Sequence, residues 1–130
     1  MLEPTQFDVD EAWIVFRLND APIQTEQDGD LNCLALMDAA SGFILGSELV
    51  AVRAVELSTI EARRLLKAGQ SHRQQLPQTL LIPREQKADA VAAEATRQHI
   101  VVKRVPENEL LVFIGEARQG FAERFGGRTQ

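Results

Sequence analysis

The chain has 130 residues, a net charge of -5, 45% apolar residues and 25% charged residues. This length predicts one domain, residues 1–130, with an ordered core at about residues 12–125. The acidic balance argues against a general affinity for nucleic acid or anionic membranes. No apolar run approaches the ~18 residues of a spanning helix, and the acidic N-terminus lacks a signal-peptide pattern. We therefore expect a cytoplasmic protein that does not contact membranes.

The first half of the chain predicts three consecutive strands. Apolar and β-branched runs indicate strands at residues 12–18, 31–37 and 43–55. Residues 19–30 read as a polar loop. Residues 38–42, Asp-Ala-Ala-Ser-Gly, predict a turn, because Asp and Ser bond their own backbone and Gly permits positive φ. These short connections favour antiparallel pairing.

The second half of the chain alternates helices with short strands. Ser58 and Glu61 match a capping box that begins a helix, and Gly69 can end it. Residues 79–82 predict a buried strand, after which Pro83 is expected to begin a second helix. The apolar stripe of that helix is Ala88, Val91, Ala92 and Ala95.

A fifth strand at residues 100–105 ends at Pro106, and a last helix follows at about residues 107–125. The expected buried stripe of this helix is Leu110, Ile114, Ala117, Phe121 and Phe125. Gly126 and Gly127 are expected to stop it. Strands joined through helices pair in parallel. The predicted fold class is therefore α/β, a mixed five-stranded sheet with helices on its faces.

Trp13 opens the first predicted strand, and residues 36–46 read as a strand end, an Asp-x-x-Ser turn and a returning strand. Leu76-Pro77 then precedes the short fourth strand. This order resembles the ribonuclease H-like fold, and the local sequence is similar to the catalytic core of retroviral integrases and insertion-sequence transposases. The resemblance covers about residues 12–125.

The first two metal-binding acids of that family are missing from this chain. Where the resemblance places them, the sequence has Phe16 and then Ile82 and Pro83. Glu116 stands at the third position, on a helix face that we interpret as solvated. One glutamate cannot hold the metal pair of two-metal phosphoryl transfer. The resemblance thus implies a degenerate, non-catalytic member that kept the fold.

Two binding hypotheses follow. The leading one is a non-enzymatic domain that binds another protein or itself, as a homodimer, through residues 31–37 or 43–55 at a sheet edge. The alternative is a small-molecule binder at the carboxyl ends of the parallel strands, around Pro83 and Pro106.

An enzymatic alternative is a nuclease or phosphodiesterase with relocated acids. It would use magnesium or manganese, which prefer carboxylate oxygens. Its metal ligands would be Asp20, Asp38 or Glu48, and Glu116. A turn role is the simpler interpretation of Asp38.

The basic and nucleophilic side chains give weaker signals. The best phosphate-contacting candidates are Arg63, Arg64, Lys67 and Arg73. We interpret them as a solvated helix face, because neighbouring glutamates dilute the charge, and we do not expect nucleic-acid binding. Cys33, the only cysteine, excludes an intrachain disulfide and reads as a buried thiol. His72 and His99 read as surface or capping side chains.

Overall fold

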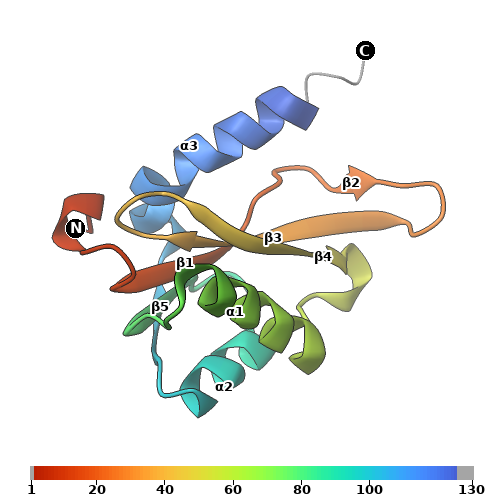
Figure 1. Cartoon of the computed structure of the whole chain (residues 1–130). Coiled ribbons are helices and arrows are strands. Elements are labelled where there is room, and N and C mark those ends of the chain that lie inside the picture. Colours follow the sequence, from red (N-terminus) through yellow and green to blue (C-terminus); the bar gives the residue numbers. More distant parts are fainter. Residues whose placement is uncertain (1, 126–130) are drawn as a thin grey trace.

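The computed structural model describes residues 2–125, apart from the side chain of Phe125, as one sheet with helices on both faces (Figure 1). Its strands are β1 (Ala12–Arg17), β2 (Ile23–Gln24), β3 (Asp30–Asp38), β4 (Ile44–Ala51), β5 (Thr79–Pro83) and β6 (Val101–Val105). Its helices are α1 (Thr59–Arg73), α2 (Asp89–Arg97) and α3 (Glu107–Phe125), with short 3-10 helices η1 (Pro4–Gln6) and η2 (Val52–Ala54). The predicted stop at Gly126 and Gly127 lies outside the described residues.

The described strands form a mixed sheet whose long strands run in the order β4-β3-β1-β5-β6. β3 pairs antiparallel with β1 and β4, whereas β5 pairs in parallel with β1 and β6. The fold class is therefore α/β, as expected. The described sheet has six strands instead of the expected five. The additional strand, β2, lies within the predicted loop at residues 19–30 and pairs with the start of β3. Two residues are too short for a sequence pattern to reveal.

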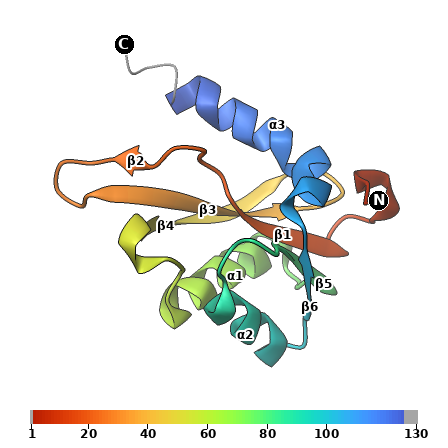
Figure 2. The same cartoon turned by 180° about the vertical axis from the view of Figure 1, so that it is seen from behind.

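α1 and α2 cover one face of the sheet, and α3 lies on the other face (Figures 1 and 2). Side chains of β1 alternate between the two cores. Trp13 and Val15 pack in the core under α1 and α2, whereas Ile14 and Phe16 pack in the core under α3. Because β1 is central and covered on both faces, its sequence is a continuous apolar run.

α1 begins after its predicted cap but does not end at Gly69. It continues to Arg73, and Gln74 at φ 64° supplies the left-handed C-cap. A Cβ on Gly69 would lie 2.8 Å from atoms of Leu36 and Trp13. The glycine therefore serves close packing of the helix on the sheet, and its prediction as a helix end is wrong.

Two other predicted boundaries are wrong. Pro83 is the last residue of β5, where it pairs with Val105, and α2 begins only at Asp89. The third predicted strand, residues 43–55, corresponds to β4 and ends at Ala51. Residues 52–54 form the 3-10 helix η2. The apolar pattern continues past Ala51 as far as Val55, so it does not show where this strand ends. Proline is also common at the start of a helix, so only the pairing with Val105 assigns Pro83 to β5.

The predicted stripe of α3 is confirmed at Leu110 and Ile114, which are fully buried. Ala117 is half-buried and packs at the margin of the same core, and Phe113 joins this core outside the predicted stripe. Phe125 was also expected in the stripe, and its side chain is outside the described part. No helix within residues 2–125 is long and apolar enough to cross a membrane.

Candidate functional site

Asp38 is fully buried at the end of β3 and holds the turn that follows. Its carboxylate accepts hydrogen bonds from the Asp10 backbone N–H at 2.7 Å, the Ser41 N–H at 2.8 Å and the Ser41 hydroxyl at 2.6 Å. Gly42, at φ 75°, closes the same turn. The bonds with Ser41 are the ones expected from the turn pattern, whereas the bond from Asp10 is a long-range contact that the pattern does not predict. Together they give the Asp38 carboxylate a structural role.

The acids proposed as metal ligands do not converge. Asp20 is exposed between β1 and β2, and Glu116 is exposed on α3. Glu48 is bound by both Nε and Nη2 of Arg64, at 2.8 and 2.7 Å. Within residues 2–125, no three His, Cys, Asp or Glu side chains form a group that could hold a metal ion. Asp20, Asp38 and Glu116 therefore do not form the centre that the nuclease hypothesis requires.

Three of the four basic candidates are engaged in ion pairs. Each arginine pairs with an acid outside α1, and the pairs are Arg63–Glu94, Arg64–Glu48 and Arg73–Asp10. The hydrogen bonds that Arg64 donates to the Glu48 carboxylate raise the pKa of Arg64. Lys67 alone is exposed with no ion-pair partner within the described residues. Only Lys67 among the four is therefore left unpaired for a phosphate.

Cys33 and the two histidines serve packing and turns. Burial raises the pKa of the Cys33 thiol, an effect that a hydrogen bond with Ser47 partly offsets, so the thiol stays protonated and weakly nucleophilic. The His72 ring stacks on Phe43, with ring centroids 5.0 Å apart. His99, at φ 66°, follows the end of α2, in agreement with a capping position.

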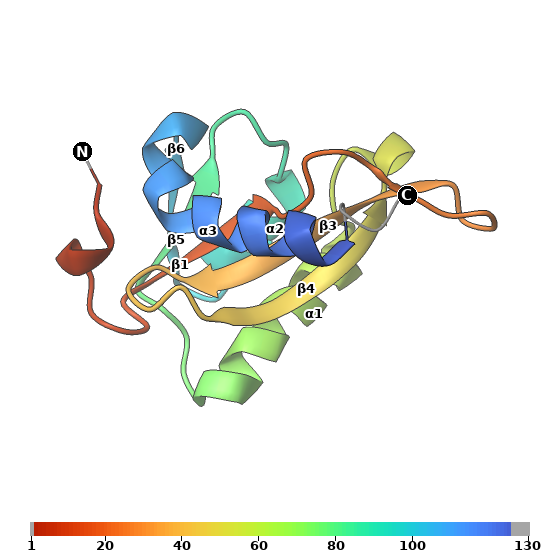
Figure 3. The same cartoon turned by 90° about the horizontal axis from the view of Figure 1, so that it is seen from above.

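The surface that best fits a binding role is the unpaired side of β4 with its flanking residues, 43–52, which we call the β4 edge. β4 pairs with β3 and with no other described strand, and Figure 3 shows it at one margin of the sheet. β3, the other predicted edge, pairs on both sides and is internal. Ten large apolar side chains are exposed within residues 2–125, and four belong to the β4 edge: Phe43, Ile44, Leu49 and Val52.

Beyond its first residues, the β4 edge lacks the devices by which natural edge strands avoid pairing. Such strands carry lysine, proline, inward-pointing charge or a β-bulge. β6, at the opposite margin, has Lys103 and Arg104, but β4 has neither lysine nor proline. Its one charge, Glu48, is neutralised by Arg64. A register shift opposite Leu36 disturbs only the first part of the strand, so the rest is a regular ladder with a free side.

Leu49 is the most exposed large apolar residue of β4 itself, with 53% of its surface accessible. It lies opposite Cys33 on β3, whose neighbours Ala35 and Met37 belong to the α3-side core. Residue alternation therefore places Leu49 on the α3 side of the sheet. The sequence predicted a strand here but not the exposure of Leu49. A sequence pattern cannot distinguish an apolar residue at an exposed sheet edge from one in the core.

The comparisons with known proteins give no family for this chain. No model of a known protein family matches the sequence, and no curated protein matches it either. Its function has to be argued from the geometry of residues 2–125.

Proposed function

We propose that the chain is a non-catalytic α/β domain of ribonuclease H-like topology that forms a symmetric dimer through the β4 edge. The element order supports the topology, as do the antiparallel unit β1–β3–β4 and the parallel unit β1–β5–β6. The observation that carries the binding role is the group of exposed apolar side chains on the β4 edge, along an eight-residue strand with one unpaired side.

Absence of catalysis rests on what occupies the acid positions of the resemblance. Phe16 and Ile82 are fully buried core residues, on opposite faces of the sheet. Asp38 is committed to its turn. Fold alone does not specify function. A domain with this topology but without the catalytic carboxylates cannot use their chemistry, which favours a binding role.

The occupant that fits the β4 edge is a second β4. A two-fold axis brings the same strand of both copies together in antiparallel register and satisfies the free N–H and C=O groups of both. The Arg64–Glu48 pair removes the repulsion that two like charges would cause there. Leu49 of each copy then loses water contact on one side of the extended sheet.

Sedimentation velocity over a range of protein concentrations tests this proposal. We expect a reversible monomer–dimer equilibrium, which Leu49→Lys shifts strongly to monomer because it places a charge on the pairing strand. The matched control is Val101→Lys, the same kind of change at a 56% exposed valine on the opposite margin, β6. It should leave the dimer intact.

Circular dichroism should show both variants folded. A wild-type protein that stays monomeric at every concentration would overturn self-association and point to a strand of a different protein as the occupant. A dimer that survives Leu49→Lys but is lost in Val101→Lys would place the interface at β6 and refute the β4 edge.

A further inference from the structure

The backbone groups of β3 alternate between its two neighbouring strands. In an antiparallel pair, the N–H and C=O of one residue point to the same neighbour, and those of the next residue point the other way. Cys33 accepts a hydrogen bond from the Leu18 N–H, which follows the end of β1. Asp38 donates its N–H to the carbonyl oxygen of Phe43, just before β4. The odd-numbered residues of β3 therefore bond β1, and the even-numbered residues bond β4.

The residues of β4 that lie opposite these even-numbered residues spend their backbone groups on β3. The pairs of this kind are Leu36–Gly46, Leu34–Glu48 and Asn32–Val50. The N–H and C=O groups that point to the free side of β4 therefore belong to Ser47, Leu49 and Ala51. The side chains of these three residues share the α3 side of the sheet, because Ser47 lies opposite Ala35 of the α3-side core.

The positions of these free groups favour one register for a symmetric pair of β4 strands. A two-fold axis sets one residue of β4 opposite the same residue of the second copy. With Leu49 on the axis, Ser47 lies opposite the partner's Ala51, and the free N–H and C=O groups of all three residues are paired. With Glu48 on the axis, Ala51 falls opposite the partner's Leu45, which the register shift leaves without a residue opposite it on β3.

The one charged residue of β4 favours the same register. With Glu48 on the axis, the carboxylates of the two copies would lie directly opposite each other, which is destabilising. With Leu49 on the axis, Glu48 lies opposite the partner's Val50, and the two Glu48 residues become diagonal neighbours about 7–8 Å apart. Arg64 of α1 neutralises each of them within its own copy, through hydrogen bonds of 2.8 and 2.7 Å.

We propose that two copies of the chain pair about Leu49, and that Arg64 is the positioning residue that lets the two Glu48 side chains approach each other. This inference rests on the self-association proposed above and specifies the register of the partner strand. On the α3 side, the two exposed Leu49 side chains pack together and lose contact with water. On the α1 side, the same approach is repulsive when Arg64 is absent.

Disulfide cross-linking tests the position of the axis, in a Cys33→Ala background that removes the only native cysteine. Leu49→Cys should form an intermolecular disulfide under mild oxidation, because residues on the axis have Cα atoms about 5.5 Å apart. The matched controls are Ser47→Cys and Ala51→Cys on the same face of β4. In this register each control lies about 14 Å from the same residue of the partner, too far for a disulfide. Non-reducing electrophoresis measures the yields.

The results of cross-linking and sedimentation velocity separate the register from self-association itself. A dimer that cross-links at Ser47→Cys or Ala51→Cys as readily as at Leu49→Cys would refute the Leu49 axis and leave the dimer in place. A dimer without a cross-link at any of the three positions would place the interface away from β4. A chain that is monomeric at every concentration would overturn the dimer and, with it, this inference.

The role of Arg64 has its own measurement, the dissociation constant of the dimer. Arg64→Ala leaves two uncompensated carboxylates close together, so we expect the dissociation constant to rise about threefold to tenfold. Adding Glu48→Gln to this variant should restore it. The matched control is Lys67→Ala, which removes an exposed cation from the same helix and should leave the dimer unchanged. An equal loss in Lys67→Ala, or no rescue by Glu48→Gln, would refute the role of Arg64.

Discussion

Gly69 shows how a single missing methyl group sets the distance between α1 and the sheet. A Cβ at this position would overlap Trp13 and Leu36, which are themselves fully buried. We expect Gly69→Ala to destabilise the fold by up to about 2 kcal/mol, because overpacking outweighs the gain in helix propensity. Urea unfolding followed by circular dichroism measures the change.

The control for this change is Gly115→Ala in α3, where a Cβ would meet nothing within 4 Å. There the gain in helix propensity is unopposed, and we expect stabilisation by about 0.5–1 kcal/mol. If Gly69→Ala were stabilising to the same extent, α1 would not pack against β1 and β3 as closely as described.

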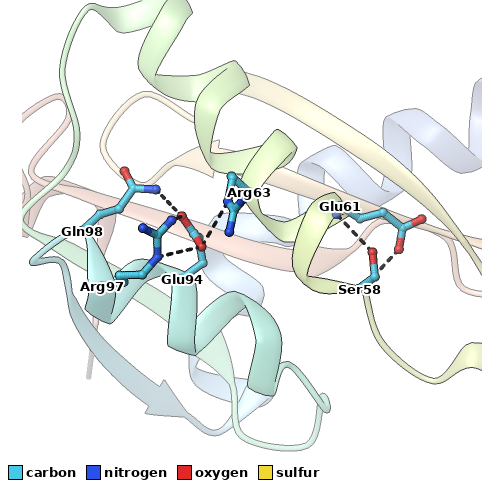
Figure 4. Close-up of polar contacts among 6 residues, drawn as sticks. All are labelled: Ser58, Glu61, Arg63, Glu94, Arg97 and Gln98. Carbon is cyan, nitrogen blue, oxygen red and sulfur yellow. Dashed lines mark hydrogen bonds and ion pairs between the residues drawn. The ribbon is translucent and has the colours of Figure 1, made fainter.

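Glu94 is a buried carboxylate on α2, 3% exposed and surrounded by Arg63, Arg97 and Gln98 (Figure 4). The hydrogen bonds from Arg97 and then Gln98 lower its pKa below the usual 4.5, although burial opposes them. Its stabilising contribution is therefore present above about pH 4.5 and is lost as the pH falls through the lowered value.

We expect Glu94→Gln to be less stable than wild type at neutral pH, and its free energy of unfolding to change less between about pH 5 and pH 3. Urea titrations across this range measure both effects. The control is Glu26→Gln, at an exposed loop position without a described hydrogen-bond partner, which should reproduce the wild-type profile. An unchanged acid profile in Glu94→Gln would show that these contacts do not persist in solution.

At the scale of single elements, α1 has the clearest local signal. Ser58 accepts a hydrogen bond from the Glu61 N–H at 3.1 Å, and the Glu61 carboxylate accepts one from the Ser58 N–H at 2.8 Å (Figure 4). We expect Ser58→Ala to cost about 1 kcal/mol of stability, measured by thermal unfolding. Glu61→Gln keeps an acceptor at the same place and should cost little. Equal losses for the two variants would contradict the capping role.

The elements that the sequence predicted are those with local causes. The capping box of α1 and the Asp38–Ser41 turn depend on residues three positions apart, and both are present. The errors have long-range causes. Gly69 lies inside α1 because the Trp13 ring occupies the space of a side chain, and Pro83 extends β5 because β6 pairs beside it.

At the scale of the whole molecule, the sheet separates two cores that do not share side chains. Ile82 lies in the core under α1 and α2, whereas Ile114 lies in the core under α3. We expect Ile82→Val and Ile114→Val each to cost about 0.5–1.5 kcal/mol, and the double variant to equal their sum within about 0.5 kcal/mol. Chemical unfolding of the three variants measures this.

The comparison pair is Ile14→Val with Ile114→Val, because both side chains belong to the α3-side core. Residues that share one core are the ones that couple, so this pair should depart from additivity more than the pair on opposite faces. Coupling as strong across the sheet as within one core would mean that the two layers respond as a single core.

The sequence by itself determined the α/β class, the order of the long strands and helices, and the turn role of Asp38, because alternation, capping and turn chemistry act over a few neighbouring residues. The tertiary structure alone decided that β4 and not β3 is an edge, and which arginines are paired. It also decided that Ser47, Leu49 and Ala51 hold the free backbone groups of that edge. These facts depend on which strands pair, and strand pairing is set by burial across the whole chain, which no local pattern contains.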